Sequence, residues 1–353
     1  MKLVINALGV LDNPNTRTQP PAGERQAMAY SSTGRGVDAR ALADARAAGL
    51  TAVHITLGHV AGSAEPFEAT VADIAAWQAC LRAHSAQLRA VHGVADIDAA
   101  QAQGQIGVIH GFQNTEMLGR IADRVALFAG LGVRVMQLTY NGRNAVGCGA
   151  TVPDDTGLTA FGAEVVERMQ QEGVLVDLSH SSERTALDTL RLARRPLAIT
   201  HSGCRAVADH PRNKSDAELR LLAEQGGVVG LYFMPYLRLS GQPMAEDLLA
   251  HLEHALQVCG EEHVGLGTDG GTTAIDDIVA YRARLAAETE LRRSLGIGAP
   301  GESADVSLFL PDLCGPTQFS VLADLLARRG HGAARIDKIL GGNFRRLFQA
   351  AWH

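Results

Sequence analysis

Cysteine is scarce in this sequence of 353 residues, and the five cysteines follow no pattern of paired spacings. An odd number of cysteines without a C-x-x-C pair argues against a disulfide framework and against a zinc ribbon. We therefore expect free thiols, as in a reducing cytoplasmic compartment. The positions are Cys80, Cys148, Cys204, Cys259 and Cys314.

An excess of basic residues and long apolar runs are also lacking. Lys and Arg number 32 against 38 Asp and Glu, the net charge is −6, and the basic residues are scattered. Nucleic acid is therefore not an expected partner. No apolar run approaches the roughly 18 residues of a membrane span, and the run before Asn6 is too short for a signal peptide. These absences predict a soluble cytoplasmic protein without a membrane partner.

Apolar residues make up 46% of the chain, enough for a large core. Short runs rich in β-branched residues alternate with longer Ala- and Leu-rich segments of helical period, which is typical of βα units. Eight such units predict a single (β/α)8 TIM barrel domain over residues 1–353, with an open doubly wound sheet as the alternative. The predicted strands are 3–7, 52–57, 106–111, 133–139, 173–179, 197–201, 227–233 and 263–268, and the predicted helices include 38–48, 71–86, 120–131, 158–172, 182–194, 215–225 and 245–259.

A further apolar run, 88–93, is interpreted as an accessory strand. It ends about 12 residues before the strand at 106–111, which leaves too little chain for a crossover helix. Long connections follow three strands, over 8–37, 140–157 and 269–305. Loops at the C-terminal ends of barrel strands build active sites, so these connections predict a substrate pocket.

Three residues with metal-binding side chains end predicted strands. His180 ends the fifth strand, His201 the sixth and Asp269 the eighth. In a barrel these ends share one mouth. Two imidazoles and a carboxylate suit zinc and leave room for a water molecule, whose pKa the ion would lower. The alternative for each histidine taken alone is a half-buried structural role.

The segments "LGVRVMQLTYN", "GVLVDLSHSS", "PLAITHSGCRAVADHPRN" and "HVGLGTDGG", with the closing "ILGGNFRRLF", resemble the membrane (renal) dipeptidase family, peptidase family M19. The likeness extends over nearly all of the chain from residue 37. It implies a metallo-dependent hydrolase barrel of the amidohydrolase type and a homodimer. It also implies cleavage of the amide bond of a dipeptide, or of a small dipeptide-like substrate with a free carboxylate, by a metal-activated water.

The resemblance also implies roles for individual residues. His180 and His201 match the two histidines that bind the second metal ion of the family. Asp269 matches a metal ligand or proton-handling carboxylate, and Arg212 matches the arginine that binds the substrate carboxylate. A guanidinium group is well shaped for a terminal carboxylate.

The chain departs from the family at three places. The run from Asn6 to Val10 replaces Asp-Gly-His-x-Asp, so both ligands of the first metal are lost; Gln113 replaces the bridging glutamate, and Tyr140 replaces a substrate-contacting histidine. These changes predict one zinc ion, held by His180, His201 and either Asp269 or Gln113. Tyr140 is a candidate oxyanion donor, or else a solvated rim residue. Asn141 is a candidate substrate contact, and both it and Asn114 have a loop-fixing role as the alternative.

Other signals favour structural roles. His54 and His110 lie within strands, the pair His251 and His254 lies on one helix face, and Cys204 is expected to be a buried thiol. Two functions other than peptide hydrolysis stay open at this point. They are a non-peptidase enzyme of secondary metabolism on the same scaffold and a catalytically silent carboxylate-binding protein.

Overall fold

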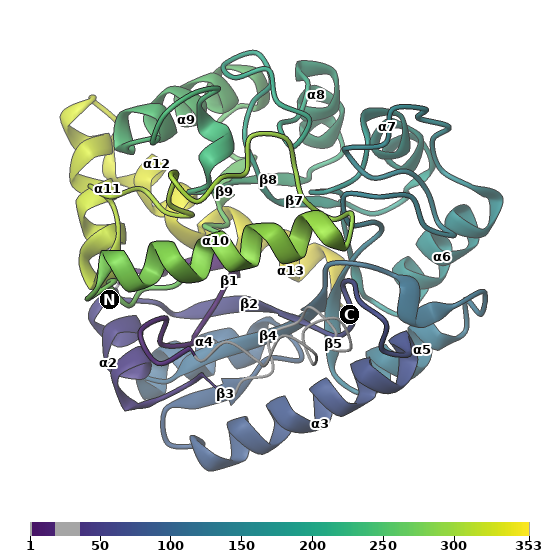
Figure 1. Cartoon of the computed structure of the whole chain (residues 1–353), viewed down its shortest axis with the longest axis horizontal. Coiled ribbons are helices and arrows are strands. Elements are labelled where there is room, and N and C mark those ends of the chain that lie inside the picture. Colours follow the sequence, from purple (N-terminus) through teal and green to yellow (C-terminus); the bar gives the residue numbers. More distant parts are fainter. Residues whose placement is uncertain (1, 18–35, 353) are drawn as a thin grey trace.

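The computed structural model describes residues 2–17 and 36–352. Within these ranges, eight parallel strands form a nearly closed barrel surrounded by helices (Figure 1), which confirms the (β/α)8 prediction. The barrel strands in spatial order are β1 (Ile5–Gly9), β2 (Ala52–Leu57), β4 (Ile106–Phe112), β5 (Val133–Gln137), β6 (Leu175–Asp177), β7 (Ala198–Ser202), β8 (Val228–Leu231) and β9 (Val264–Leu266).

The helices of the described ranges follow the strands along the chain. They are α2 (Ala39–Ala47), α3 (Pro66–Ala83), α4 (Val94–Gln103), α5 (Arg124–Gly130), α6 (Ala160–Gln171), α7 (Glu183–Leu192), α8 (Asp216–Glu224), α9 (Ala245–Cys259), α10 (Ile278–Ser294), α11 (Gln318–Arg328), α12 (Ala333–Asp337) and α13 (Asn343–Ala351). None of the helices in these ranges combines the length and hydropathy of a membrane span.

The barrel is joined between β1 and the segment that follows β9. The backbone N–H of Asp269 donates to the carbonyl of Leu8 at 2.9 Å. The buried amide of Asn6 accepts from the N–H of Thr268 and donates to its hydroxyl oxygen, each at 2.8 Å. Because buried amide groups must be hydrogen-bonded, this reciprocal pair fixes the seam.

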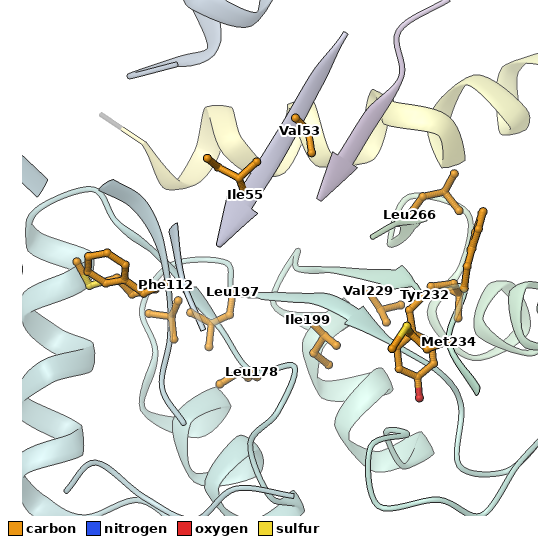
Figure 2. Packing of buried hydrophobic residues seen from close by; sticks show 14 of the residues in the cluster. Val53, Ile55, Phe112, Leu178, Leu197, Ile199, Val229, Tyr232, Met234 and Leu266 are labelled. Carbon is orange, nitrogen blue, oxygen red and sulfur yellow. The ribbon is translucent and has the colours of Figure 1, made fainter. Parts of the chain in front are cut away.

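Apolar residues pack on both sides of the strands. Figure 2 shows part of the larger cluster, which includes Ile199 of β7 and Val229 of β8 together with residues of the surrounding helices. A second cluster joins residues at the strand starts, such as Ile5, to Phe344 and Phe348 of α13. The C-terminal helix thus packs at the N-terminal ends of the strands, opposite the end that carries His180 and His201.

Side chains cap the starts of two helices. Thr159 accepts from the N–H of Gly162 at the start of α6. Ser215 and Glu218 form a reciprocal capping box at the start of α8. Such caps satisfy amide groups that have no partner within the helix.

Two connections differ from the prediction. The run at 88–93 is indeed off the barrel path, as β3 (Leu88–Ala90), but the ten-residue helix α4 does connect it to β4, so the argument from length was wrong. Gly104, at φ 67°, ends α4 abruptly, so few residues are needed between this helix and β4. The connection 269–305 contains the 17-residue α10. Most of the connection 8–37 lies outside the described residues.

Candidate metal and substrate site

The strand ends bring His180 and His201 together at the barrel mouth. Their Nε2 atoms are 3.0 Å apart, and both residues are at most 3% exposed. This convergence is what the strand-end positions predict. The ligation of an ion by these residues stays a prediction.

A neighbouring amide defines the tautomer of His180. Asn141 Nδ2 donates to the carbonyl of Ile297 at 2.7 Å, which turns the Asn141 Oδ1 toward the ring. That oxygen lies 2.7 Å from His180 Nδ1. Since an amide oxygen only accepts, His180 carries its proton on Nδ1 and presents an Nε2 lone pair. Asn141 therefore contacts His180 directly, beside its predicted role toward substrate.

The ring of His201 also has a hydrogen-bonding partner beside each of its nitrogens. Its Nδ1 lies 2.9 Å from the hydroxyl oxygen of Thr200, and its Nε2 lies 3.2 Å from Nε2 of Gln113. With the amide turned this way, Gln113 donates to a lone pair on His201. Rotation of the Gln113 amide would present its oxygen instead, which is a weak ligand.

The chemistry of the two facing rings agrees with a divalent cation between them. Burial first, and the charge of Arg212 second, hold the pKa of both His180 and His201 well below the usual range, which disfavours a second proton on either ring. Two lone pairs 3.0 Å apart then repel unless a cation lies between them. Zinc–nitrogen bonds of about 2.1 Å at a tetrahedral angle would separate two ligand nitrogens by about 3.4 Å, somewhat more than the 3.0 Å between the two Nε2 atoms.

Asp269 lies at the same mouth in an unusual backbone conformation, with φ 58°. Burial raises the pKa of its carboxyl to about 6, although the charges of Arg212 and Arg292 oppose this shift. Over residues 2–17 and 36–352, no three His, Cys, Asp or Glu side chains form a group that could hold a metal. Asp269 does not complete such a group with His180 and His201, and its role as third ligand stays a prediction.

The first-metal positions of the family carry apolar side chains. Leu8, where the family has histidine, is 1% exposed, and Val10 stands where the family has the second aspartate. Asn6 is engaged in the seam through Thr268. These replacements are the basis for expecting a single ion, and the number of ions stays a prediction.

Tyr140 belongs to a polar cluster that the sequence did not predict. Its ring stacks on His180 with centroids 4.2 Å apart, and its hydroxyl oxygen accepts from Arg292 of α10 at 3.1 Å. Arg292 pairs with Glu302 at 2.8 Å, and Tyr236 donates to the same carboxylate at 2.7 Å. The connection that contains α10 thereby reaches the predicted site, across the front of the barrel in Figure 1.

Arg212 is 1% exposed and donates through Nη1 to the carbonyl of Ser179 at 2.5 Å. Its charge acts on the pKa of His180, His201 and Asp269, which places the guanidinium near all three. Carboxylate binding by Arg212 stays a prediction.

The remaining candidates have structural contacts. His251 accepts from the N–H of Cys204 and contacts the carbonyl of Leu237, and His254 pairs with Asp216. Burial raises the pKa of the Cys204 thiol, as expected for a buried and inert cysteine. Asn114 accepts from its neighbour's backbone N–H, which agrees with a loop-fixing role.

A parallel barrel with two facing histidines at its mouth defines a metallo-dependent hydrolase fold of the amidohydrolase type. Residues 26–294 match the membrane dipeptidase family, peptidase family M19, and the chain belongs to this family. Members of the family are metal-dependent dipeptidases.

Individual relatives agree with this assignment. An uncharacterized dipeptidase of Schizosaccharomyces pombe is 32% identical over 52% of this chain and 47% of its own, and the dipeptidase verJ of Clonostachys rogersoniana is 32% identical over 47% and 43%. The chain thus spans about half the length of these curated relatives. An amidohydrolase from Pseudomonas aeruginosa superposes with TM-score 0.80, at 27% identity over 99% of this chain and 97% of that one.

A metallopeptidase from Rhodobacter sphaeroides, liganded with a phosphinate mimic of L-Ala-D-Ala, shares the fold. Its TM-score is 0.76 at 21% identity, with all of both chains covered.

Proposed function

We propose that this chain is a metal-dependent hydrolase that cleaves the amide bond of a dipeptide, or of a small dipeptide-like compound with a free carboxylate. The observation that carries the proposal is the pair of facing Nε2 atoms of His180 and His201, 3.0 Å apart at the mouth. These histidines would hold one zinc ion, with Gln113 or Asp269 as a further ligand. A single domain over 1–353, a homodimer and a cytoplasmic location belong to the same proposal.

A bound zinc ion supplies a Lewis acid and makes a water molecule acidic enough to ionise near neutral pH. The chain's own groups do the rest. Asp269, with its pKa raised to about 6, accepts and relays the proton. Tyr140 keeps its hydroxyl proton available for the substrate carbonyl oxygen, because its own oxygen accepts from Arg292. Arg212 binds the substrate carboxylate.

A second candidate is a non-peptidase reaction on the same scaffold. The replacement of two family ligands by Leu8 and Val10, together with Tyr140 in place of histidine, favours a changed substrate. Catalytic silence with a retained carboxylate pocket is the third outcome that the following experiment separates.

The test combines metal analysis with a dipeptide panel that includes Cys-Gly and dipeptides ending in D-residues. We expect about one equivalent of zinc in the wild type, and loss of it in both His180→Ala and His201→Ala, because each removes one ligand of a minimal set. His254→Ala, at a half-buried position of α9 that pairs with Asp216, is the control and should keep the metal.

Each outcome decides between the candidates. Less than about a tenth of an equivalent after supplementation would contradict both enzymatic functions. Stoichiometric metal without turnover of any dipeptide would favour the non-peptidase reaction. Unchanged metal content in either histidine variant would refute the ligand assignment.

A further inference from the structure

A buried chain of hydrogen bonds leads from β6 to His201. Asp177, the last residue of β6, is fully buried in the barrel, and its Oδ2 accepts from the hydroxyl of Thr200 at 2.6 Å. The Thr200 oxygen lies 2.9 Å from Nδ1 of His201. The other carboxylate oxygen accepts from the N–H of Ser179, the hydroxyl of Ser179 and the N–H of Thr200.

The direction of each bond follows from the donors available. An ionised carboxylate only accepts, so the Thr200 hydroxyl gives its single proton to Asp177. The Thr200 oxygen can then only accept from His201, which requires the proton of His201 on Nδ1. The Nε2 of His201 is thereby left with its lone pair, aimed at His180.

We propose that Asp177 and Thr200 are positioning residues that hold His201 in the Nδ1–H tautomer and so prepare its Nε2 to bind a cation. The proposal rests on the proposed function, since it assigns these residues to the ion between His180 and His201. Asp177 lies too deep to be a ligand in this arrangement, because Thr200 separates its carboxylate from the ring. Hydrogen bonds on the far nitrogen of a metal-binding histidine fix its tautomer and orientation, and their loss costs 10- to 100-fold in metal affinity as an order of magnitude.

The arrangement has a clear alternative state. Without the Thr200 hydroxyl, Nδ1–H would lack its partner, and a proton on Nε2 could instead be shared with the lone pair of His180 at 3.0 Å. That state pairs the two Nε2 atoms without an ion. Asp177→Asn would favour the same state, because an amide N–H donated to Thr200 would turn the Thr200 hydroxyl toward Nδ1.

Four variants test this hydrogen-bond relay, in which Asp177 acts on His201 through Thr200. Thr200→Val removes the hydroxyl and keeps the side-chain shape, Thr200→Ser keeps the hydroxyl, and Asp177→Asn reverses the donor direction. Thr189→Val on α7 is the matched control, because Thr189 is equally buried and its hydroxyl donates to the carbonyl of Thr185 within the same helix. Melting temperature and circular dichroism identify folded variants, and Asp177→Asn carries the test if Thr200→Val does not fold.

Two measurements are made on each folded variant. Long-range proton–nitrogen correlations of metal-free, ¹⁵N-histidine-labelled protein report which nitrogen of His201 carries the proton. Competition with a chromogenic chelator gives the zinc dissociation constant. We expect Thr200→Val and Asp177→Asn to move the proton to Nε2 and to weaken zinc binding by about 10- to 100-fold, whereas Thr200→Ser and Thr189→Val should stay within about threefold of the wild type.

The outcomes separate the relay from the proposed function. If the wild type binds zinc and Thr200→Val changes neither the tautomer nor the affinity, the relay is overturned and the proposed function stands. If the wild type binds no zinc but Thr200→Val still moves the proton, the proposed function fails while the tautomer control is supported. An equal loss of affinity in Thr189→Val would also overturn the relay, since the effect would then follow from any lost buried hydroxyl.

Discussion

Removal of the Arg292 cation should destabilise the protein through the carboxylate that remains. Arg292 and Glu302 are 11% and 8% exposed and are joined by two bonds, at 2.8 and 2.9 Å. Arg292→Met keeps most of the side-chain stem but leaves Glu302 with the hydroxyl of Tyr236 and the N–H of Ala299. One buried charge without its partner costs about 3–5 kcal/mol.

A double-mutant cycle with Glu302→Gln isolates the pair. The double variant should lose less free energy of unfolding than the sum of the single variants, with an interaction energy of about 1–3 kcal/mol. Urea unfolding at pH 7, followed by circular dichroism, measures it. Arg293→Met, whose side chain is 66% exposed in a surface pair, is the control and should change stability by less than about 0.5 kcal/mol.

The pH dependence gives an independent check. In the wild type, burial raises the pKa of Glu302, but the bonds and charge of Arg292 outweigh this and the net pKa is lowered. The pair therefore stabilises the protein at pH values above the pKa of Glu302 in the unfolded chain, near 4.5. This stabilisation is lost as the pH falls through the lower pKa of Glu302 in the folded protein. Relative to the wild type, Arg292→Met should lower the free energy of unfolding by a large amount at pH 7 and by a smaller amount near pH 4. Additive single effects, or a loss independent of pH, would refute the reasoning.

Four further predictions follow from individual contacts. Arg212→Ala should raise KM more than it lowers kcat for a dipeptide, and an equal fall in kcat and kcat/KM would mean that Arg212 acts in the transition state. Asn6→Ala should lower the free energy of unfolding by about 1–3 kcal/mol, measured in urea, because the N–H of Thr268 loses its acceptor. Burial lowers the pKa of His110 to about 4, so stability should fall as pH drops from about 6.5 to 4, and urea titrations of His110→Gln should show a shallower fall. Gln113→Glu should tighten zinc binding at an unchanged stoichiometry of one, and two equivalents by metal analysis would show that the apolar first site can still bind.

The strands were predictable because each is a short run rich in β-branched residues that is buried on both faces of the sheet. The run 52–57 coincides with β2. Helix α10 was not predictable from periodicity, since only Leu285 and Thr289 of its 17 residues are buried and the apolar stripe is missing. Helix α4 was excluded by a length argument that did not allow for the glycines at both of its ends.

The convergence of His180 and His201 was predictable because parallel strands of a barrel end at one mouth. The contacts of Arg292 were not predictable, because 152 positions separate it from Tyr140 and neither residue belongs to a regular sequence pattern. Asp177 did leave a signal: a carboxylate inside an apolar strand must be paired or hydrogen-bonded. The sequence could not identify Thr200 as the partner, since that depends on the register of β7 against β6.

The substitutions in this chain increase the importance of that carboxylate. With Gln113 neutral and apolar side chains at Leu8 and Val10, the acidic ligands of the family's first ion are absent from these positions. Arg212 and Arg292 meanwhile place positive charge near the histidines. Under the proposed function, a cation at this mouth would depend for negative charge on the carboxylates of Asp269 and Asp177. Because Asp177 acts through Thr200, its influence is directional: it determines which nitrogen of His201 faces the ion as well as adding negative charge.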